Sequence, residues 1–295
     1  REIELRRPKR ILFAAPDGII LQVRRLASEV MGEYGLAVYV GGDPCYGACD
    51  TCELESERLG VDLVFHIGHS VARSIGKRTI FIDAFDDVSF NKVLSESIDS
   101  FRDLERIGLC TISQHLNRLD EAKKLLEDKG FKVRIGAGSG LLRSGQVFGC
   151  RFHTVYKIKD EVDAFLFLGQ SRFHAIGVAL STGRPTFMLD PYLDGVIDTG
   201  PLADKVWRRA LLAVYKARDV DEFGLIVGLK ERQMNIKKAM KIRSEVESFG
   251  RKVLPITLRE ITPERLAQLQ MDAYIQTACP RLSIDGIRHD KPLLS

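Results

Sequence analysis

The sequence predicts an α/β protein made of three related Rossmann-like units with parallel sheets, in a pseudo-threefold arrangement around one centre. Short apolar runs alternate with segments of helical period along the whole chain. The order strand, helix, strand recurs three times, and a glycine follows each of these helices directly before the next strand. These glycines are Gly35, Gly130 and Gly250. Glycine in that place is typical of a left-handed helix cap, so three segments far apart in the sequence share one local design.

The first strand of each unit is a short apolar run, and a helix and a second strand follow it. The predicted first strands cover 11–15, 107–112 and 225–229. The first helix is expected to end near residue 33, and the other two are expected to cover 117–128 and 235–249. The second strands are expected at 36–40, 132–135 and 252–256. Strands joined through a helix run parallel, so each unit should form its own small parallel sheet.

A third strand in each unit begins beside an aspartate that marks the repeat. The three aspartates are Asp62, Asp163 and Asp272. Successive copies are separated by roughly 100 residues, which is a typical size for a small domain. We therefore predict three units at 1–103, 104–204 and 205–295.

Composition places the chain among folded proteins and excludes several functions. Hydrophobic residues make up 45% and charged residues 28%, a balance that disordered or collagen-like chains lack. The net charge of +4 is too small to predict nucleic-acid binding. Apolar runs such as 164–168 are far shorter than the roughly 18 residues of a membrane span. Residues 1–10 are too charged for a secretory signal, so we expect a cytoplasmic protein.

Six cysteines in a chain for which we expect no secretory signal point to metal or redox chemistry rather than to a disulfide framework. Cys45, Cys49 and Cys52 have the spacing C-x3-C-x2-C, by which conventional radical S-adenosylmethionine enzymes hold a [4Fe-4S] cluster. In those enzymes the motif follows the first strand of a barrel, whereas here it follows the second strand of a unit. Cys110 lies within an apolar strand and is expected to be a buried core residue.

The repeat selects a different set of three cysteines. Cys49 and Cys150 precede the marker aspartates of their units by the same interval, so both should occupy equivalent loops. Cys279 follows Asp272 closely, at the carboxyl end of the third strand of its unit. Ligands of open parallel sheets bind beyond the carboxyl ends of the strands. These three thiols could therefore meet at one centre; three unrelated thiols are the alternative.

Several longer segments form recognisable motifs: 42–50 (GDPCYGACD), 145–150 (GQVFGC), 169–177 (GQSRFHAIG), 190–192 (DPY) and 277–285 (TACPRLSID). On these motifs the sequence resembles the radical-type 3-amino-3-carboxypropyl transferases that begin diphthamide synthesis, in particular the archaeal form. The order of these motifs spans nearly the whole chain. Two departures are the bulky 151–153 (RFH) after Cys150, and the end at Ser295, where relatives continue.

The resemblance implies that Cys49, Cys150 and Cys279 hold a [4Fe-4S] cluster whose fourth iron binds S-adenosylmethionine. The cluster receives an electron from an external donor. Cleavage of the bond to the amino acid side gives methylthioadenosine and a 3-amino-3-carboxypropyl radical, which adds to a histidine of translation elongation factor 2. The resemblance also implies a homodimer. Without it, the residues leave two alternatives open: a conventional radical enzyme using Cys45, Cys49 and Cys52, or a nucleotide-binding module without redox chemistry.

Four residues are candidates for gripping S-adenosylmethionine. Gly169, Gln170 and His174 lie at a predicted turn from strand to helix, where backbone N–H groups can hold a carboxylate. Arg281 lies just beyond Cys279 and could form a bidentate contact with the cofactor carboxylate.

His66 and His69 have the i, i+3 spacing of a metal-binding pair. No acidic or cysteine partner stands at a supporting spacing, so the sequence does not predict zinc there.

Overall fold

The computed structural model describes residues 1–72, 78–230 and 232–295, and it contains three separate sheets, one for each repeat. The strand orders are β2-β1-β3-β4, β6-β5-β7-β8-β9 and β11-β10-β12-β13. The first four strands of every sheet therefore follow the same order. Neighbouring strands are parallel except for the antiparallel pair β8 and β9. The predicted α/β class with parallel sheets is confirmed.

The elements of the first sheet and its helices are α1 (Glu2–Arg6), β1 (Arg10–Ala14), the 3-10 turn η1 (Asp17–Ile19), α2 (Ile20–Tyr34), β2 (Ala37–Val40), α3 (Glu53–Leu59), β3 (Leu63–Ile67) and β4 (Thr79–Ile82). The next elements are α4 (Asn91–Ser97), η2 (Ile98–Phe101), β5 (Arg106–Thr111), η3 (Ser113–Arg118), α5 (Leu119–Asp128), β6 (Lys132–Arg134), α6 (His153–Ile158), β7 (Ala164–Leu168), α7 (Arg172–Thr182), β8 (Thr186–Asp190) and β9 (Gly195–Asp198). The last elements are α8 (Gly200–Ala217), β10 (Glu222–Gly228), α9 (Ile236–Ser248), β11 (Lys252–Leu258), α10 (Pro263–Leu269), β12 (Ala273–Gln276), α11 (Arg281–Asp285) and β13 (Leu293–Leu294).

The central strands of each sheet are buried on both faces because helices cover both sides. All the residues of β7 and of β3 are buried, which explains why these strands read as continuous apolar runs. Cys110 in β5 is fully buried, as predicted. Each sheet has its own apolar core, so each unit buries its side chains largely against itself.

The repeated glycines terminate the helices as the sequence predicts. Gly35, Gly130 and Gly250 have φ angles of +62°, +93° and +77°. An L-residue with a Cβ atom is strained in this region, which is why glycine recurs at all three points.

The marker aspartate has a structural role in the first two units. The Asp62 carboxylate accepts hydrogen bonds from the backbone N–H groups of Lys9 (2.7 Å) and Arg10 (2.9 Å). Asp163 accepts the equivalent bonds from Glu105 (3.1 Å) and Arg106 (2.8 Å). In these units the aspartate therefore joins the start of the third strand to the start of the first.

The third copy of the aspartate behaves differently. Asp272 forms an ion pair with Lys291, 3.5 Å away, next to the edge strand β13. The third unit therefore repeats the position of the aspartate but not its contacts.

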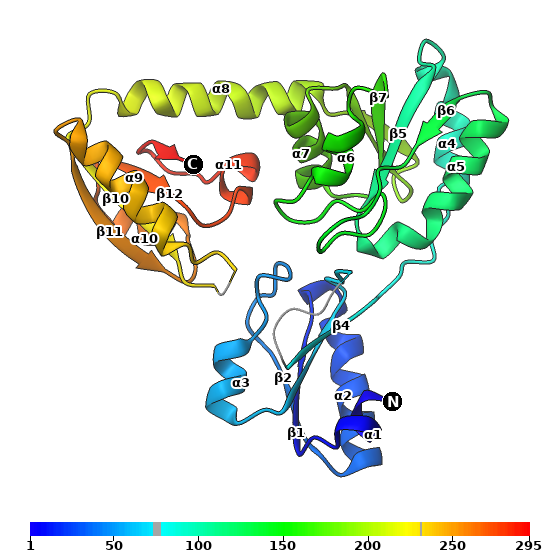
Figure 1. Ribbon diagram of the computed structural model, residues 1–295, viewed down its shortest axis with the longest axis horizontal. Coiled ribbons are helices and arrows are strands. Elements are labelled where there is room, and N and C mark those ends of the chain that lie inside the picture. Colours follow the sequence, from blue (N-terminus) through cyan, green and yellow to red (C-terminus); the bar gives the residue numbers. More distant parts are fainter. Residues whose placement is uncertain (73–77, 231) are drawn as a thin grey trace.

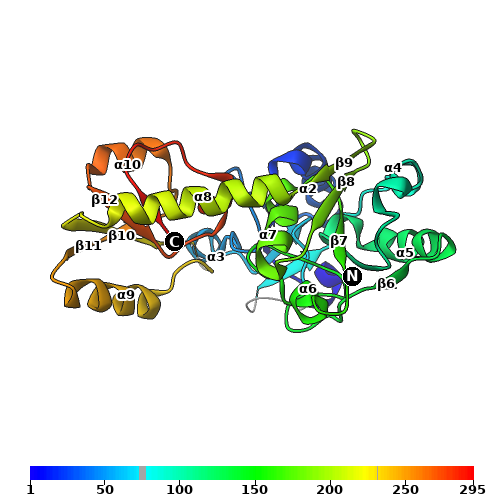
Figure 2. The same ribbon diagram turned by 90° about the horizontal axis from the view of Figure 1, so that it is seen from above.

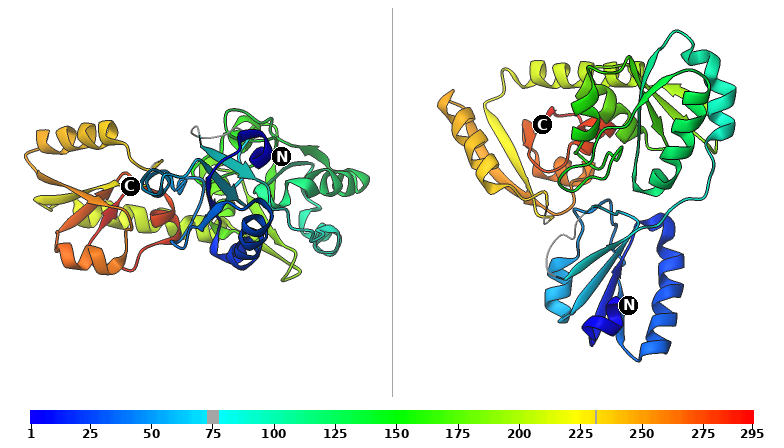
Figure 3. Two further views of the ribbon diagram at one scale, coloured as in Figure 1. Left: turned by 90° about the horizontal axis from the view of Figure 1, so that it is seen from below. Right: turned by 45° about the vertical axis from the view of Figure 1, so that its right-hand side comes forward.

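The three units occupy separate corners of the molecule. Figure 1 shows the first unit below and between the other two, with the loops that follow its strands turned toward them. Helix α8 runs from the second unit to the third, which is plain from above in Figure 2, and Figure 3 shows the first unit projecting from the other two. Helix α4 packs with α5 and β9, so it joins the core of the second sheet. The unit boundaries at 103 and 204 remain predictions.

Among the described residues, no helix combines the length and the apolarity that crossing a bilayer requires.

Candidate functional site

The structure brings three cysteines from the three units into one region. Cys49 lies in the loop between β2 and α3, Cys150 in the equivalent loop between β6 and α6, and Cys279 directly after β12. The charges of Cys279 and Cys150 both act on the Cys49 thiol, and Cys150 acts on Cys279. The three sulfurs are thus electrostatic neighbours although they are far apart in sequence.

Burial raises the pKa of two of these thiols, those of Cys49 and Cys279, and so favours their protonated forms when no metal is bound. Burial, followed by the charges of Cys279 and Cys150, raises the pKa of Cys49 to about 11. Burial also raises the pKa of Cys279, although the backbone N–H of Arg281 partly opposes the change by donating to the sulfur. A bound metal would displace these protons, because the thiolate is the ligand form.

Polar contacts fix the first unit against the second beside this region. The Arg143 guanidinium holds the Asp83 carboxylate with two hydrogen bonds of 2.8 and 3.0 Å. The buried Gln146 side chain donates to the carbonyl oxygen of Ser70 at 2.9 Å. Gln146 lies four residues before Cys150 in the same loop, so this bond ties the Cys150 loop to the first unit.

A buried ion pair fixes the first unit against the third. The Lys230 ammonium, beyond the carboxyl end of β10, lies 3.0 Å from the Asp50 carboxylate and 2.8 Å from that of Glu260. Lys230 also lies over the ring of Tyr46, 4.7 Å from its centroid. Burial lowers the pKa of Lys230, but the hydrogen bonds to Glu260 and Asp50 outweigh it, so the pKa is raised overall. Asp50 is next to Cys49, so this pair positions the loop that carries it.

Gln276 organises the turn that presents Cys279. Its side-chain oxygen accepts hydrogen bonds from the N–H groups of Ala278 (2.9 Å) and Cys279 (3.0 Å), and its amide nitrogen donates to the Cys279 carbonyl (3.1 Å). The residue is only 5% exposed, so water cannot replace these bonds readily.

Replacing Gln276 with alanine is expected to cost about 2–4 kcal/mol of unfolding free energy, since three hydrogen bonds are lost. The variant should also alkylate faster at Cys279, because the turn loses its anchor. Iodoacetamide labelling mapped by mass spectrometry checks this. Gln146→Ala is the control: it removes another buried glutamine without touching this turn, and equal acceleration in both variants would contradict the assignment.

The turn after β7 supports the Cys150 loop. The Nε2 atom of His174 accepts a hydrogen bond from the N–H of Gly149 (3.1 Å), and its Nδ1 atom pairs with the Ser171 hydroxyl (2.7 Å). Both ring nitrogens therefore have protein partners, which favours a positioning role over direct contact with a ligand. Gly177 allows Phe152 to pack closely, because a Cβ atom there would clash with the ring. This packing accounts for the bulky residue after Cys150.

The pH dependence of stability should report on His174. Burial, followed by the charges of Arg281 and His69, lowers the pKa of His174 to about 3. The unfolded chain binds a proton at about pH 6.5 and the folded chain does not, so stability falls as pH drops from about 6.5 toward 3. His174→Gln should reduce the slope of unfolding free energy against pH by about 1.4 kcal/mol per unit in this range. Urea unfolding at several pH values measures it, and an unchanged slope would count against the buried, neutral ring.

The other residues predicted to bind S-adenosylmethionine lie at or near the turn between β7 and α7. Gly169 follows β7 with a φ of +133°, and a Cβ atom there would meet the His115 ring at 3.2 Å. Gln170 comes next and is exposed. Arg281 pairs with Asp285 at 2.6 Å and lies over the Phe173 ring, 5.5 Å from its centroid. Its charge acts on Cys279 and His174, so it sits between the second and third units.

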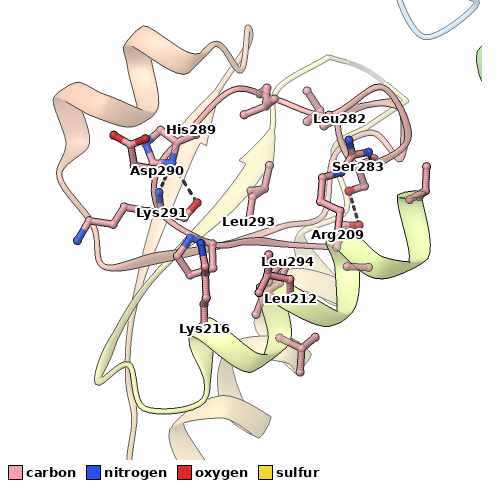
Figure 4. Close-up of a pocket in the computed structure, with 18 residues that line it drawn as sticks. Arg209, Leu212, Lys216, Leu282, Ser283, His289, Asp290, Lys291, Leu293 and Leu294 are labelled. Carbon is pink, nitrogen blue, oxygen red and sulfur yellow. Dashed lines mark hydrogen bonds between the residues drawn. The ribbon is translucent and has the colours of Figure 1, made fainter. Parts of the chain in front are cut away.

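Cavities flank this region. One of about 310 Å³ is lined by Cys279 and Arg281 together with Lys230 and Tyr46. Another of about 340 Å³ is lined by Cys45, Cys52, Asp50 and Lys230 among others. A third, of about 260 Å³, lies between α8 and the C-terminal segment and is lined by residues such as Leu212 and Leu294 (Figure 4). None of the predicted site residues lines that third cavity, so we do not assign it to the site.

Cys45, the first cysteine of the C-x3-C-x2-C spacing, lies beside the histidine pair His66 and His69, an arrangement that the sequence does not predict. Cys45 lies against His66 and His69, with its sulfur 3.7 Å from a ring nitrogen of each. The sequence offers these histidines no cysteine partner at a supporting spacing, but the fold supplies one. Spacing failed as a guide because Cys45, which is distant from His66 in sequence, reaches the end of β3 through a loop. Burial holds the pKa of the two rings down, to about 3 for His66 and about 4 for His69.

Sequence reasoning missed Gln276, Lys230 and Asp50. Gln276 ends a strand directly before the 277–285 motif, so the buried strand pattern could have drawn attention to it. Lysine and aspartate in loops are usually exposed, and nothing in the local pattern marks these two as a buried pair.

The chain is similar to proteins of diphthamide synthesis. A profile of the diphthamide synthesis protein family matches residues 15–295. The 2-(3-amino-3-carboxypropyl)histidine synthase of Pyrococcus horikoshii is 34% identical over 283 residues, which cover 94% of this chain and 80% of the relative. Subunit 1 of the Caenorhabditis elegans enzyme of that name is 29% identical, with 97% of this chain and 74% of the relative covered. Both relatives bear the name of a transferase enzyme.

A solved structure shows the same architecture. The crystal structure of Dph2 from Pyrococcus horikoshii with a 4Fe-4S cluster superposes with a TM-score of 0.90 at 31% identity, covering 99% of this chain and 85% of that chain. A second crystal structure of the same protein gives a TM-score of 0.91. From the profile match, the sequence identity and this shared fold, the chain belongs to the diphthamide synthesis protein family.

Proposed function

We propose that this protein transfers the 3-amino-3-carboxypropyl group of S-adenosylmethionine to a histidine of translation elongation factor 2, the first step of diphthamide synthesis. Cys49, Cys150 and Cys279 would hold a [4Fe-4S] cluster at the centre of a pseudo-threefold arrangement of units. The observation that carries the proposal is that thiols from three repeats lie within electrostatic reach: in addition to burial, Cys279 and Cys150 raise the pKa of Cys49, and Cys150 raises that of Cys279. The name and the bound cluster of the Pyrococcus horikoshii relatives support it.

The donor set fits the proposed cofactor. Thiolates are the usual ligands of iron–sulfur clusters, and three of them leave one iron for another ligand. When bound, the cluster supplies that open iron and a single electron. Cys49 and Cys279 are half-buried and Cys150 is exposed, so the region is sheltered but has an entrance.

The chain's own residues must then select which carbon–sulfur bond of S-adenosylmethionine breaks, which is a problem of orientation. The cavity lined by Cys279 and Arg281 is within the usual size of ligand pockets. Arg281 offers a guanidinium to the carboxylate of the amino acid moiety. Gly169 and Gln170 lie before the N-terminus of α7, whose dipole would favour the same carboxylate. His174 holds the Cys150 loop through Gly149.

The proposed partners are the elongation factor, an external electron donor and a second copy of this chain in the cytoplasm. Helix α8 supports a homodimer because it leaves a run of large apolar side chains exposed. These are Trp207, Leu211, Leu212, Val214 and Tyr215.

The conventional radical motif is a weaker candidate. In that arrangement Cys45 and Cys52 would join Cys49, but Cys45 is turned to His66 and His69, whereas the thiols that act on Cys49 are Cys279 and Cys150. A nucleotide-binding module without redox chemistry would explain the cavities but not the convergence of thiols.

Product analysis tests the proposed function. The anaerobic protein is incubated with S-adenosylmethionine, dithionite and archaeal elongation factor 2. We expect methylthioadenosine in solution, and a 3-amino-3-carboxypropyl group on a histidine of the factor by mass spectrometry. Formation of 5′-deoxyadenosine alone would assign the conventional bond cleavage, and the absence of any turnover together with nucleotide binding would favour the binding module.

A further inference from the structure

Cys45, His66 and His69 form a compact cluster outside the proposed cluster ligands. The Cys45 sulfur lies 3.7 Å from Nε2 of His66 and 3.7 Å from Nδ1 of His69, and the two ring nitrogens are 3.2 Å apart. These ligand atoms all lie within 4.8 Å of one another. They come from the loop after β2, from β3 itself and from the turn after β3, so the fold rather than local sequence assembles them.

We propose that these three side chains bind a zinc ion. Zinc in proteins is tetrahedral, with bonds of about 2.3 Å to sulfur and about 2.0–2.1 Å to nitrogen. Such a geometry places sulfur and nitrogen about 3.6 Å apart and the two nitrogens about 3.3 Å apart. The observed separations of 3.7, 3.7 and 3.2 Å agree with this spacing. One position between the three atoms therefore suits a zinc ion without rearrangement.

The environment keeps the donor atoms directed at one another. Cys45 and His66 are buried, with exposed fractions of 8% and 0%. The His66 ring packs against Phe81, with 5.0 Å between ring centroids, and its Nδ1 atom has no hydrogen-bond partner among the described residues. Packing thus sets the orientation of this ring and leaves Nε2 aimed at the other two donors.

Three protein ligands leave a fourth position for water or another small donor. Cys45 lines the cavity of about 340 Å³, from which water can reach the ion. The Asp50 carboxylate also lies near, but Lys230 and the backbone N–H of Tyr46 already occupy its oxygens. The zinc would tie the loop of residues 45–52 to the end of β3. Cys49 belongs to the same loop, but the ion pair of Asp50 with Lys230 also anchors this loop, so iron binding should not require the zinc.

Metal counting on matched variants tests the site. The full chain is reconstituted anaerobically with iron and sulfide and dialysed against zinc, and both metals are measured per chain by plasma mass spectrometry. Cys45→Ser and His69→Gln remove ligands. Cys150→Ser and His153→Gln remove the same residue types elsewhere, and circular dichroism verifies that each variant is folded. Cobalt(II) in place of zinc adds a thiolate-to-metal absorption band that depends on Cys45.

We expect about one zinc per chain in the wild-type protein and in both controls. Each ligand variant should lose zinc affinity by more than the roughly 10–100-fold that an outer-shell change costs. The proposal would be overturned if Cys45→Ser and His69→Gln retained zinc. It would also be overturned if the wild-type protein bound zinc no better than these variants. A loss of iron and zinc together in Cys45→Ser would overturn it as well, since that would make Cys45 a cluster ligand. If zinc binding depends on Cys45 but the wild-type protein binds no iron, the zinc site is supported and the proposed function is rejected.

Discussion

Serine in place of Cys150 is expected to abolish iron binding and turnover, whereas serine in place of Cys45 is expected to leave the iron content unchanged. Cys150 is exposed, so its replacement should not impair folding. Its loss would leave two protein ligands for the cluster, and loss of a direct ligand should cost more than the roughly 10–100-fold effect of an outer-shell change. Serine at Cys279 and at Cys49 should act in the same way.

Iron, acid-labile sulfide and methylthioadenosine formation are measured for each cysteine variant after anaerobic reconstitution. Cys45→Ser is the decisive comparison, because Cys45 belongs to the C-x3-C-x2-C spacing but is turned to the two histidines. Loss of iron in Cys45→Ser with retention in Cys150→Ser would restore the conventional motif as the cluster site.

Methionine in place of Lys230 should destabilise the protein by about 3–5 kcal/mol, because it leaves the buried Asp50 carboxylate without its partner. The side chains of Lys230 and Asp50 are only 5% and 10% exposed, and they join the third unit to the first. Urea unfolding of the apoprotein, followed by circular dichroism, measures the loss. Because Asp50 adjoins Cys49, the variant should also bind iron less tightly.

Two further variants isolate the cause. Lys92→Met makes the same substitution in the exposed pair of Lys92 and Asp194, where a change of about 0–1 kcal/mol is expected. Adding Asp50→Asn to Lys230→Met should recover part of the stability, since the neutral amide removes the unpaired charge while still accepting from the N–H of Tyr46. If Lys92→Met and Lys230→Met reduced the free energy of unfolding by the same small amount, the pair of Lys230 and Asp50 would not be a buried link between units.

The sequence predicts features that depend on local patterns. The strands, the helix-terminating glycines and the equivalence of the Cys49 and Cys150 loops follow from spacing and from backbone chemistry that each repeat contains within itself. The same reasoning places the 169–177 segment correctly at a turn from β7 to α7.

Features that depend on contacts between distant segments are not predictable in this way. Helix α4 falls within residues 1–103 of the predicted first unit, but its buried residues Val93 and Leu94 pack in the core of the second sheet. Nothing in the local sequence says which sheet receives this helix. The approach of Cys45 to His66 and His69 depends on the path of a loop. The pairing of Lys230 with Asp50 requires two units to dock, so neither residue stands out before the units are assembled.

Mössbauer spectroscopy of the anaerobically reconstituted wild-type protein, with and without S-adenosylmethionine, tests most directly that three cysteines hold a cluster with one open iron. We predict cluster iron of which about one quarter changes its signal when S-adenosylmethionine is added. Absence of cluster iron, or a signal in which all irons stay equivalent after the addition, would contradict this account.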